Sequence, residues 1–307
     1  MHAVRVDLPF TPPLLPDNLY GHLVATAVPG VEEWRDGAYR RSLRLPGGPC
    51  VVTLPLPSRS RVVATLHLTD DADADAAVAA CRRILDLDAE PAAVDGVLAA
   101  DDVLAPLVAA APGRRVPGCP DAAEFAVRAV LGQQVSTAAA RTHAGRLVVA
   151  HGEPADDPAG GLTHLFPTPA ALTGLDEEAL AFPRSRRRTL VGLVAALASG
   201  TVRLGEDPAD PRAGLADLLA LPGIGPWTVE SVAMRALGDP DAFLPTDLGI
   251  IGAAKALSLP ASPKGLTAHA ERWRPYRAYA VQHLWATGTH AVNRLPGAPT
   301  PSAAPPP

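Results

Sequence analysis

Two short segments in the last third of the chain carry residue types that together suit a chemical reaction. The first is Leu221-Pro222-Gly223-Ile224-Gly225-Pro226-Trp227, and the second is Pro245-Thr246-Asp247. Glycines allow a tight turn, and free amides at the start of the next helix form a site for an anion such as a phosphate. One carboxylate near a bound phosphate suits a reaction at a nucleic-acid sugar. Each segment alone is a weak signal, but their order and spacing together are a strong one.

Two helices are expected to position the glycine segment. Apolar residues repeat with helical spacing over 214–221 and 227–237, which predicts a hairpin between two helices. Ile224 is expected to anchor the turn in the core, while amides near Gly223 and Gly225 face outward. Taken alone, the glycines fit an ordinary helix–turn–helix corner better than an anion site, so the motif needs support from its context.

The carboxylate stands where a further helix, over 247–257, is expected to begin. An aspartate at this position often serves only as the N-cap of its helix. Asp247 follows Gly225 by 22 residues, and Pro245 restricts the backbone just before it. Taken alone, a helix cap is the favoured interpretation; the catalytic interpretation is favoured by this spacing and, more strongly, by the resemblance given below.

The two segments resemble the helix-hairpin-helix and the catalytic-aspartate segment of the base-excision DNA glycosylase superfamily. Further matches narrow the resemblance to the DNA-3-methyladenine glycosylase II family, the alkylation-repair branch. The matching stretches are 116–121, 128–136, 271–280 and 283–285, with a less specific match at 39–43. The resemblance covers about residues 8 to 290. It implies an α+β protein, in which an N-terminal antiparallel sheet with helices precedes an all-α helix-hairpin-helix core.

The resemblance implies that Asp247 is the catalytic residue. Cleavage of an N-glycosidic bond builds positive charge on the sugar, and an ionised carboxylate facing the anomeric carbon stabilises that charge. The same carboxylate could orient or deprotonate the attacking water, and the sequence leaves both roles open. An alkylated purine already carries positive charge, so it leaves without a second, acidic group.

Trp227 occupies the position at which strand-cutting members of the superfamily carry a lysine nucleophile. The only two lysines, Lys255 and Lys264, do not match that position. We therefore expect a monofunctional glycosylase that leaves an abasic site. Three scattered cysteines cannot supply the four ligands of an iron–sulfur cluster. We expect no metal and no cofactor, apart from the monovalent cation at the hairpin that the resemblance suggests.

The resemblance places the base pocket against Trp227 and Trp285. A flipped-out base would enter this pocket, and the indole faces would attract a cationic one. The alternative is that tryptophans pack in the core, and for Trp273 we prefer that interpretation. Three wall positions that are aromatic in the best-known pattern are not aromatic here: His22, Ser231 and Leu248. This difference bears on the range of substrates and not on the class of reaction.

Contacts with DNA are expected from the hairpin and from a second turn. Gln134, in the turn over 132–136, matches the residue that relatives insert into the minor groove as a wedge; its alternative is a helix-capping amide. The predicted hairpin contacts are Gly223, Ile224, Gly225 and Thr228. The basic run over 184–188 is either a solvated helix start or a phosphate contact.

The net charge of −5 is unevenly distributed along the 307 residues. Residues 1–112 have a net charge of −6, and residues 181–294 have a net charge of +4, so a polyanion is expected to meet the second half. The chain has 25 arginines and 2 lysines. We interpret this excess mainly as a reflection of the base composition of the genome. No apolar run reaches the ~18 residues of a membrane span. The first residues do not resemble a signal peptide, and the few cysteines fit a reducing cytoplasm.

The first hundred residues are expected to form a mixed α/β unit. Strands are predicted over 39–45, 50–56 and 61–68, with a helix over 73–87. The predicted helices of the second half are 138–149, 176–181, 185–199, 214–221, 227–237, 247–257, 267–272 and 276–287, after one that Asp121 begins. We expect three parts: an N-terminal domain over 1–97, a helical core over 98–295 and a disordered proline-rich tail over 296–307.

Two other functions compete with an alkylated-base glycosylase. A catalytically silent, damage-sensing protein could use the same hairpin, but it would gain nothing from Asp247. A glycosylase for oxidised or mismatched bases is disfavoured by the tryptophan at the lysine position and the missing cluster cysteines. The expected partner is double-stranded DNA with alkylated bases, bound by a monomer in the cytoplasm at the nucleoid and not at a membrane.

Overall fold

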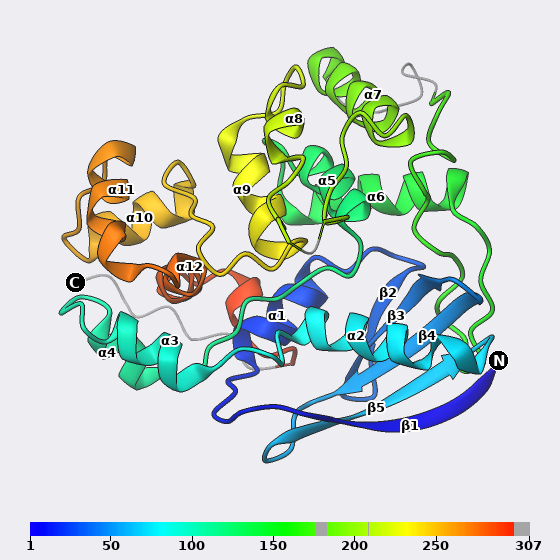
Figure 1. Cartoon of the computed structure of the whole chain (residues 1–307), viewed down its shortest axis with the longest axis horizontal. Helices are drawn as coiled ribbons and strands as arrows, with labels where there is room; N and C mark the ends of the chain where they lie inside the picture. The colour runs from blue at the N-terminus through cyan, green and yellow to red at the C-terminus, as the bar shows by residue number, and fades with distance from the viewer. Residues whose placement is uncertain (176–182, 208, 298–307) are drawn as a thin grey trace.

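A computed structural model describes residues 1–175, 183–207 and 209–297 of the chain (Figure 1). A five-stranded antiparallel sheet has the strand order β1-β5-β4-β3-β2. Its strands are β1 (His2–Pro9), β2 (Glu32–Arg35), β3 (Ala38–Leu45), β4 (Gly48–Pro55) and β5 (Arg61–Leu68). The mixed fold class expected from the sequence is confirmed.

Three of the strands lie where alternating apolar residues predict them, and two were missed. The strand β1 forms one edge of the sheet, and most of its residues are at least partly exposed. The strand β2 forms the other edge and has only four residues, Glu-Glu-Trp-Arg. A sequence this short and polar lacks the apolar alternation that indicates a strand. Its Glu32 is buried because it pairs with Arg41 and Arg128.

The other regular elements of the described chain are helices and short 3-10 turns. The first four are α1 (Asp17–Ala25), α2 (Ala74–Leu85), α3 (Pro91–Leu98) and α4 (Ala105–Ala110). The next four are α5 (Ala122–Leu131), α6 (Thr137–His151), α7 (Arg184–Ala198) and α8 (Leu215–Leu219). The last four are α9 (Pro226–Arg235), α10 (Leu248–Ala256), α11 (Pro263–Ala270) and α12 (Arg277–Ala286). Short 3-10 turns are η1 (Asp71–Asp73), η3 (Glu271–Trp273) and η4 (Ala291–Asn293).

Most predicted helices agree with these bounds within a few residues. Helix α11 starts at Pro263, four residues earlier than expected, because the Ser262 hydroxyl accepts a hydrogen bond from the Gly265 amide and caps the helix. The helix expected over 176–181 lies outside the described residues, as does nearly all of the tail expected over 296–307. Within the described part of the chain, no helix is long and apolar enough to cross a membrane.

Helix α5 begins with the aspartate cap that the sequence predicts. The Asp121 carboxylate accepts a hydrogen bond from the Glu124 amide at 2.8 Å. The Glu124 side chain does not return to the cap; it pairs with Arg41 of β3 at 2.8 Å and with Arg128 at 2.7 Å. This buried pairing fixes the sheet to α5 and explains why Arg41 belongs to the recognisable segment over 39–43.

Buried apolar residues form two clusters. One lies on the sheet and includes Leu19 and Tyr20 of α1 with Ile84 of α2. The other fills the space between the helices of the second half, and it also takes in Val28 and Val31. The division into domains at residues 97 and 98 stays a prediction. Figure 1 shows α1 at the junction between the sheet and the helices.

The segment over 291–294 closes against α1. A Cβ atom placed on Gly21 would lie 2.2 Å from the Arg294 carbonyl oxygen, so only glycine allows this approach. The side-chain amide of Asn293 donates to the Trp285 carbonyl at 2.6 Å. Elements from both ends of the described chain therefore meet at one place, beside α12.

Candidate active site

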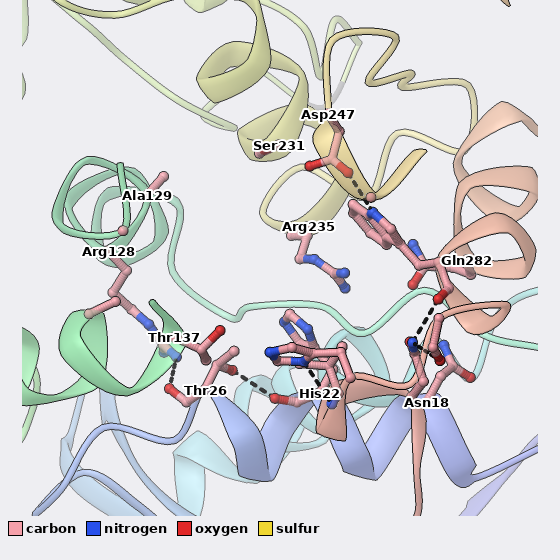
Figure 2. A pocket seen from close by; sticks show the side chains of 18 of the residues that line it. Asn18, His22, Thr26, Arg128, Ala129, Thr137, Ser231, Arg235, Asp247 and Gln282 are labelled. Atoms are coloured by element: carbon pink, nitrogen blue, oxygen red, sulfur yellow. Dashed lines mark hydrogen bonds between the residues drawn. The ribbon is translucent and has the colours of Figure 1, made fainter. Parts of the chain in front are cut away.

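A cavity of about 860 Å³ opens where α1, α5, α6, α9, α10, α12 and the η4 segment meet. Figure 2 shows His22 and Asn18 rising from α1 on one side, with Asp247 and Arg235 on the opposite side. Its lining includes Asp247, Trp227 and Trp285, which the sequence predicts for one site. The fold thus brings together residues more than two hundred positions apart.

Asp247 lines the cavity and also caps α10. Its Oδ1 atom accepts a hydrogen bond from the Ile250 amide at 3.0 Å and a second from Trp285 Nε1 at 2.8 Å. Its Oδ2 atom accepts from Trp227 Nε1 at 2.9 Å. Asp247 is therefore both a helix cap and a carboxylate of the cavity, because its Oδ1 atom accepts from the Ile250 amide and from Trp285 together.

The two tryptophans come from different helices, and each donates one hydrogen bond to the Asp247 carboxylate. Trp227 starts α9 just after the glycine hairpin, and Trp285 lies near the end of α12. Charge-assisted hydrogen bonds of this length are among the stronger ones in proteins. Trp273 is fully buried and donates to Asp101 at 3.0 Å, so its predicted place in the core is confirmed.

Two of the three non-aromatic wall residues line the cavity, and one does not. His22 lies in the lining, where burial, Arg235 and Arg128 hold its pKa well below the usual value. Ser231 also lines it and donates its hydroxyl to the Trp227 carbonyl at 2.7 Å.

The expectation that Leu248 forms the pocket wall is wrong. Its side chain is 85% exposed and does not line the cavity. Leu248 directly follows the cap residue Asp247, and the first turn of α10 directs its side chain outward. Gly249 lies at the wall instead, where an added Cβ would be 3.1 Å from both Asp247 Oδ1 and Trp285 Cδ1. Neighbouring residues on a helix differ in direction by about 100°, so Gly249 reaches the wall where Leu248 does not.

The glycine hairpin has the geometry that the sequence predicts. Gly223 has a φ of +85°, and a Cβ there would lie 1.9 Å from the Thr189 hydroxyl oxygen. Within the described ranges, no hydrogen bond forms at the amides of Gly223, Gly225 and Trp227. These amides lie before and in the first turn of α9, where the helix dipole favours an anion.

Ile224 and Thr228 have structural roles in the hairpin. Ile224 is 7% exposed and packs in the helical cluster, which confirms it as the anchor of the turn, and its amide already donates to Leu221. Thr228 is 2% exposed, and its amide donates to Gly225. The DNA contacts predicted for Ile224 and Thr228 stay predictions, and the burial of both side chains leaves the backbone of the hairpin as the part that would make them.

The turn over 132–136 lies beside the hairpin. The Gln133 side-chain amide donates to the Gly223 carbonyl at 3.2 Å and to the Thr228 hydroxyl at 3.3 Å. Gln134 is exposed and has a φ of +55°. Ser136, and not Gln134, caps α6. Gln134 as a wedge stays a prediction, with its side chain free to perform that role.

The basic run over 184–188 starts α7, as expected, but it is not uniformly solvated. Arg184 and Arg188 are exposed, whereas Arg186 is 7% exposed. Thr189, on the same helix, contacts the glycine hairpin. Helix α7 thus meets the hairpin through Thr189, while Arg184 and Arg188 of the run lie on the surface.

Arg128 and Arg235 also line the cavity, and sequence reasoning assigned neither a role there. Arg128 donates to the Thr26 carbonyl at 2.9 Å and is neutralised by its acidic neighbours. Arg235 is 7% exposed, and burial lowers its pKa to about 9. A signal for Arg235 was present, since Trp227, Ser231 and Arg235 follow each other at intervals of four and share a helix face.

Metal ligation has little support in the described ranges. They contain no group of three or more histidine, cysteine and acidic side chains arranged to hold an ion. The described cysteines are free and buried, and burial raises their pKa to about 12. A monovalent cation at the hairpin stays a prediction.

The chain is similar to known proteins over nearly all of its length. It is 37% identical over 276 residues to "DNA-3-methyladenine glycosylase 2" of Escherichia coli K12, with 88% of this chain and 92% of that protein covered. The chain belongs to this glycosylase family. Residues 5–121 match the family model described as the AlkA N-terminal domain.

Two further proteins are similar to this chain, one in sequence and one in fold. A Mycobacterium tuberculosis protein, "Probable bifunctional transcriptional activator/DNA repair enzyme AlkA", is 53% identical over 294 residues. That match covers 96% of this chain but only 59% of the relative's length. A solved structure, "3-methyladenine dna-glycosylase from Archaeoglobus fulgidus", superposes with a TM-score of 0.75 at 20% identity. It covers 91% of this chain and 97% of that one, and at this identity it supports the fold alone.

Proposed function

We propose that this chain is a monofunctional DNA glycosylase that excises alkylated bases, of the 3-methyladenine type, from duplex DNA and leaves an abasic site. The observation that carries the proposal is the Asp247 carboxylate, held by two indole N–H groups at the wall of a cavity large enough for a flipped base. Membership of the glycosylase family supports the same reaction.

The reaction needs three things that the described residues supply. The free amides of the hairpin bind a backbone phosphate, which fixes the strand beside the cavity. The damaged base rotates out of the stack into the cavity. Asp247, ionised and oriented by Trp227 and Trp285, then faces the sugar and stabilises the positive charge that develops as the base departs.

Water completes the reaction. It adds to the anomeric carbon and loses a proton, which restores a neutral sugar without a base. Asp247 either supports the cationic sugar electrostatically or takes that proton. Because Trp227 stands where strand-cutting relatives carry a lysine, no covalent intermediate forms and the strand stays intact. The chain acts on DNA as a monomer at the nucleoid, with no cofactor other than a monovalent cation at the hairpin.

The experiment follows released bases and strand breaks together. Methylated duplex DNA is incubated with the protein, and we expect release of 3-methyladenine with no nicking. Asp247→Asn is nearly the same size and should still bind DNA but lose most turnover. Near-normal turnover by this variant would refute the catalytic assignment.

A silent damage-binding protein is the second candidate. It would bind methylated DNA tightly and release nothing, and Asp247→Asn would then change neither property. Binding should weaken steeply as salt rises in both cases, because phosphate contacts release counterions. Base release is therefore the measurement that separates the two functions.

A further inference from the structure

Arg235 places a cation in the wall of the base cavity. It is the last residue of α9, it lines the cavity and it is 7% exposed. One of its guanidinium nitrogens donates to the Pro117 carbonyl at 2.8 Å, which anchors the group to the backbone. Figure 2 shows the side chain extending from α9 into the space between Asp247 and His22.

Three arginines line the cavity, Arg128, Arg141 and Arg235. Arg141 donates to the Ala27 carbonyl at 2.7 Å, and Arg235 differs from Arg128 in how its charge is paired. Arg128 forms ion pairs with Glu32 at 3.1 Å and Glu124 at 2.7 Å, so its charge is cancelled locally. Among the described residues, no carboxylate forms an ion pair with Arg235 within 4 Å, and the more distant Asp247 carboxylate favours its protonated form. Its guanidinium lies over the Trp285 ring, 5.4 Å from the ring centre. With a pKa of about 9 it remains protonated at neutral pH.

Trp285 therefore contacts two charges of opposite sign, one at its N–H edge and one at its ring face. The indole N–H of Trp285 binds the Asp247 carboxylate, and the indole ring contacts the Arg235 cation. If Asp247 faces the sugar, the base occupies the space beyond it, toward Arg235 and His22. A cationic base would then lie near a fixed positive charge. The repulsion from this charge would oppose the attraction between the base and the indole faces.

We propose that Arg235 directs charge during the reaction, by raising the energy of a positively charged base in the cavity and releasing that energy as the base leaves. This inference rests on the proposed function. The bond between the anomeric carbon and the base nitrogen breaks, and its electron pair stays with the base. The base becomes neutral and the sugar takes the positive charge, which moves away from Arg235 and toward Asp247.

Such a role has a kinetic signature that a structural role lacks. Removing the Arg235 charge lowers the free energy of the bound cationic substrate more than that of the transition state. The substrate therefore binds more tightly, and its base leaves more slowly. A variant that lowers both KM and kcat has lost ground-state destabilisation. A variant with a merely disturbed pocket would bind its substrate more weakly.

The test compares Arg235→Met with Arg235→Lys. Methionine keeps an unbranched chain without charge, and lysine keeps the charge. With a duplex carrying one 7-methylguanine, which is cationic, we expect Arg235→Met to lower the single-turnover rate about tenfold and to tighten half-saturation several-fold. Arg235→Lys should retain most of both values. An unchanged rate, or a slower rate with weaker half-saturation, would overturn the inference.

Binding measurements separate this inference from the proposed function. In the Asp247→Asn background, adding Arg235→Met should tighten binding to the 7-methylguanine duplex. The same change should leave binding to a duplex with a tetrahydrofuran abasic analogue unaffected, since no base enters the cavity. Equal tightening on both duplexes, or none, refutes the role of Arg235. If the wild-type protein releases no base, the proposed function fails, whatever these binding ratios are. Melting temperatures of the variants identify any that do not fold.

Discussion

Replacing Trp227 by phenylalanine removes one hydrogen bond to Asp247 while keeping an aromatic ring in the wall. The Trp227 indole is the one donor to Asp247 Oδ2 among the described residues, at 2.9 Å. Asp247 Oδ1 has two donors, so it keeps the Ile250 amide when Trp285 is changed. We therefore expect Trp227→Phe to disturb the carboxylate more than Trp285→Phe does.

The size of the effect follows from the kind of bond that is lost. A hydrogen bond to a charged group contributes about 1.5–3 kcal/mol. Water in the open cavity replaces part of it, so the lower end applies, and about 1.4 kcal/mol corresponds to a tenfold change in rate. Trp227→Phe should thus lower the single-turnover rate of base release about tenfold. The double variant should lower the rate by less than the product of the two single-variant factors, because both indoles act on one carboxylate.

Trp273→Phe is a matched control for this experiment. The Trp273 indole also donates to a carboxylate, that of Asp101, at 3.0 Å, but neither residue lines the cavity. Trp273→Phe should lower the melting temperature and leave the rate of the folded enzyme unchanged. A rate for Trp227→Phe within twofold of the wild type, or an equal loss in the control, would refute positioning by the cavity indoles.

Three further outcomes are expected. Gly223→Ala should cost about 1–3 kcal/mol of stability, because of its positive φ and the 1.9 Å approach to Thr189. Gly225→Ala, where an added Cβ meets nothing within 4 Å, should cost clearly less; equal melting temperatures would refute the steric argument. Burial lowers the pKa of His283 to about 3, so the unfolded chain binds a proton between pH 6.5 and about 3 that the folded chain does not. Stability is therefore lost as pH falls through this window, by about 2 kcal/mol at pH 5 for this group. In chemical denaturation, His283→Asn should show a correspondingly smaller loss between pH 7 and 5, and parallel losses would contradict this assignment. Leu248→Ser should change melting temperature and base release little, since the side chain is 85% exposed; a large loss of release would restore Leu248 to the substrate site.

Local patterns predicted the local parts of this structure well. The glycine hairpin, its Ile224 anchor and the helix that Asp247 caps all depend on residues close in sequence. Three strands and most helices follow from periodicity for the same reason. The strand β2 was missed because its burial comes from ion pairs with distant arginines, which no local pattern records.

The site was predicted best where a family motif fixed the residue and least well where packing across the chain decided it. The resemblance placed Leu248 on the wall, but the first turn of α10 leaves its side chain exposed. Arg235 was missed although it shares a helix face with Trp227 and Ser231. The contribution of α1 to the opposite wall depends on how the sheet sits against the helices, and the sequence alone does not provide that arrangement.

The contact between Gly21 and Arg294 has a consequence for the timing of activity during synthesis. Helix α1, which forms one wall of the cavity, is translated well before the segment over 291–294 that closes against it. In a polypeptide still on the ribosome, the cavity cannot close against α1 until Arg294 has emerged from the exit tunnel. We expect arrested nascent chains that stop short of this residue to release no damaged bases, because one side of the cavity is still open.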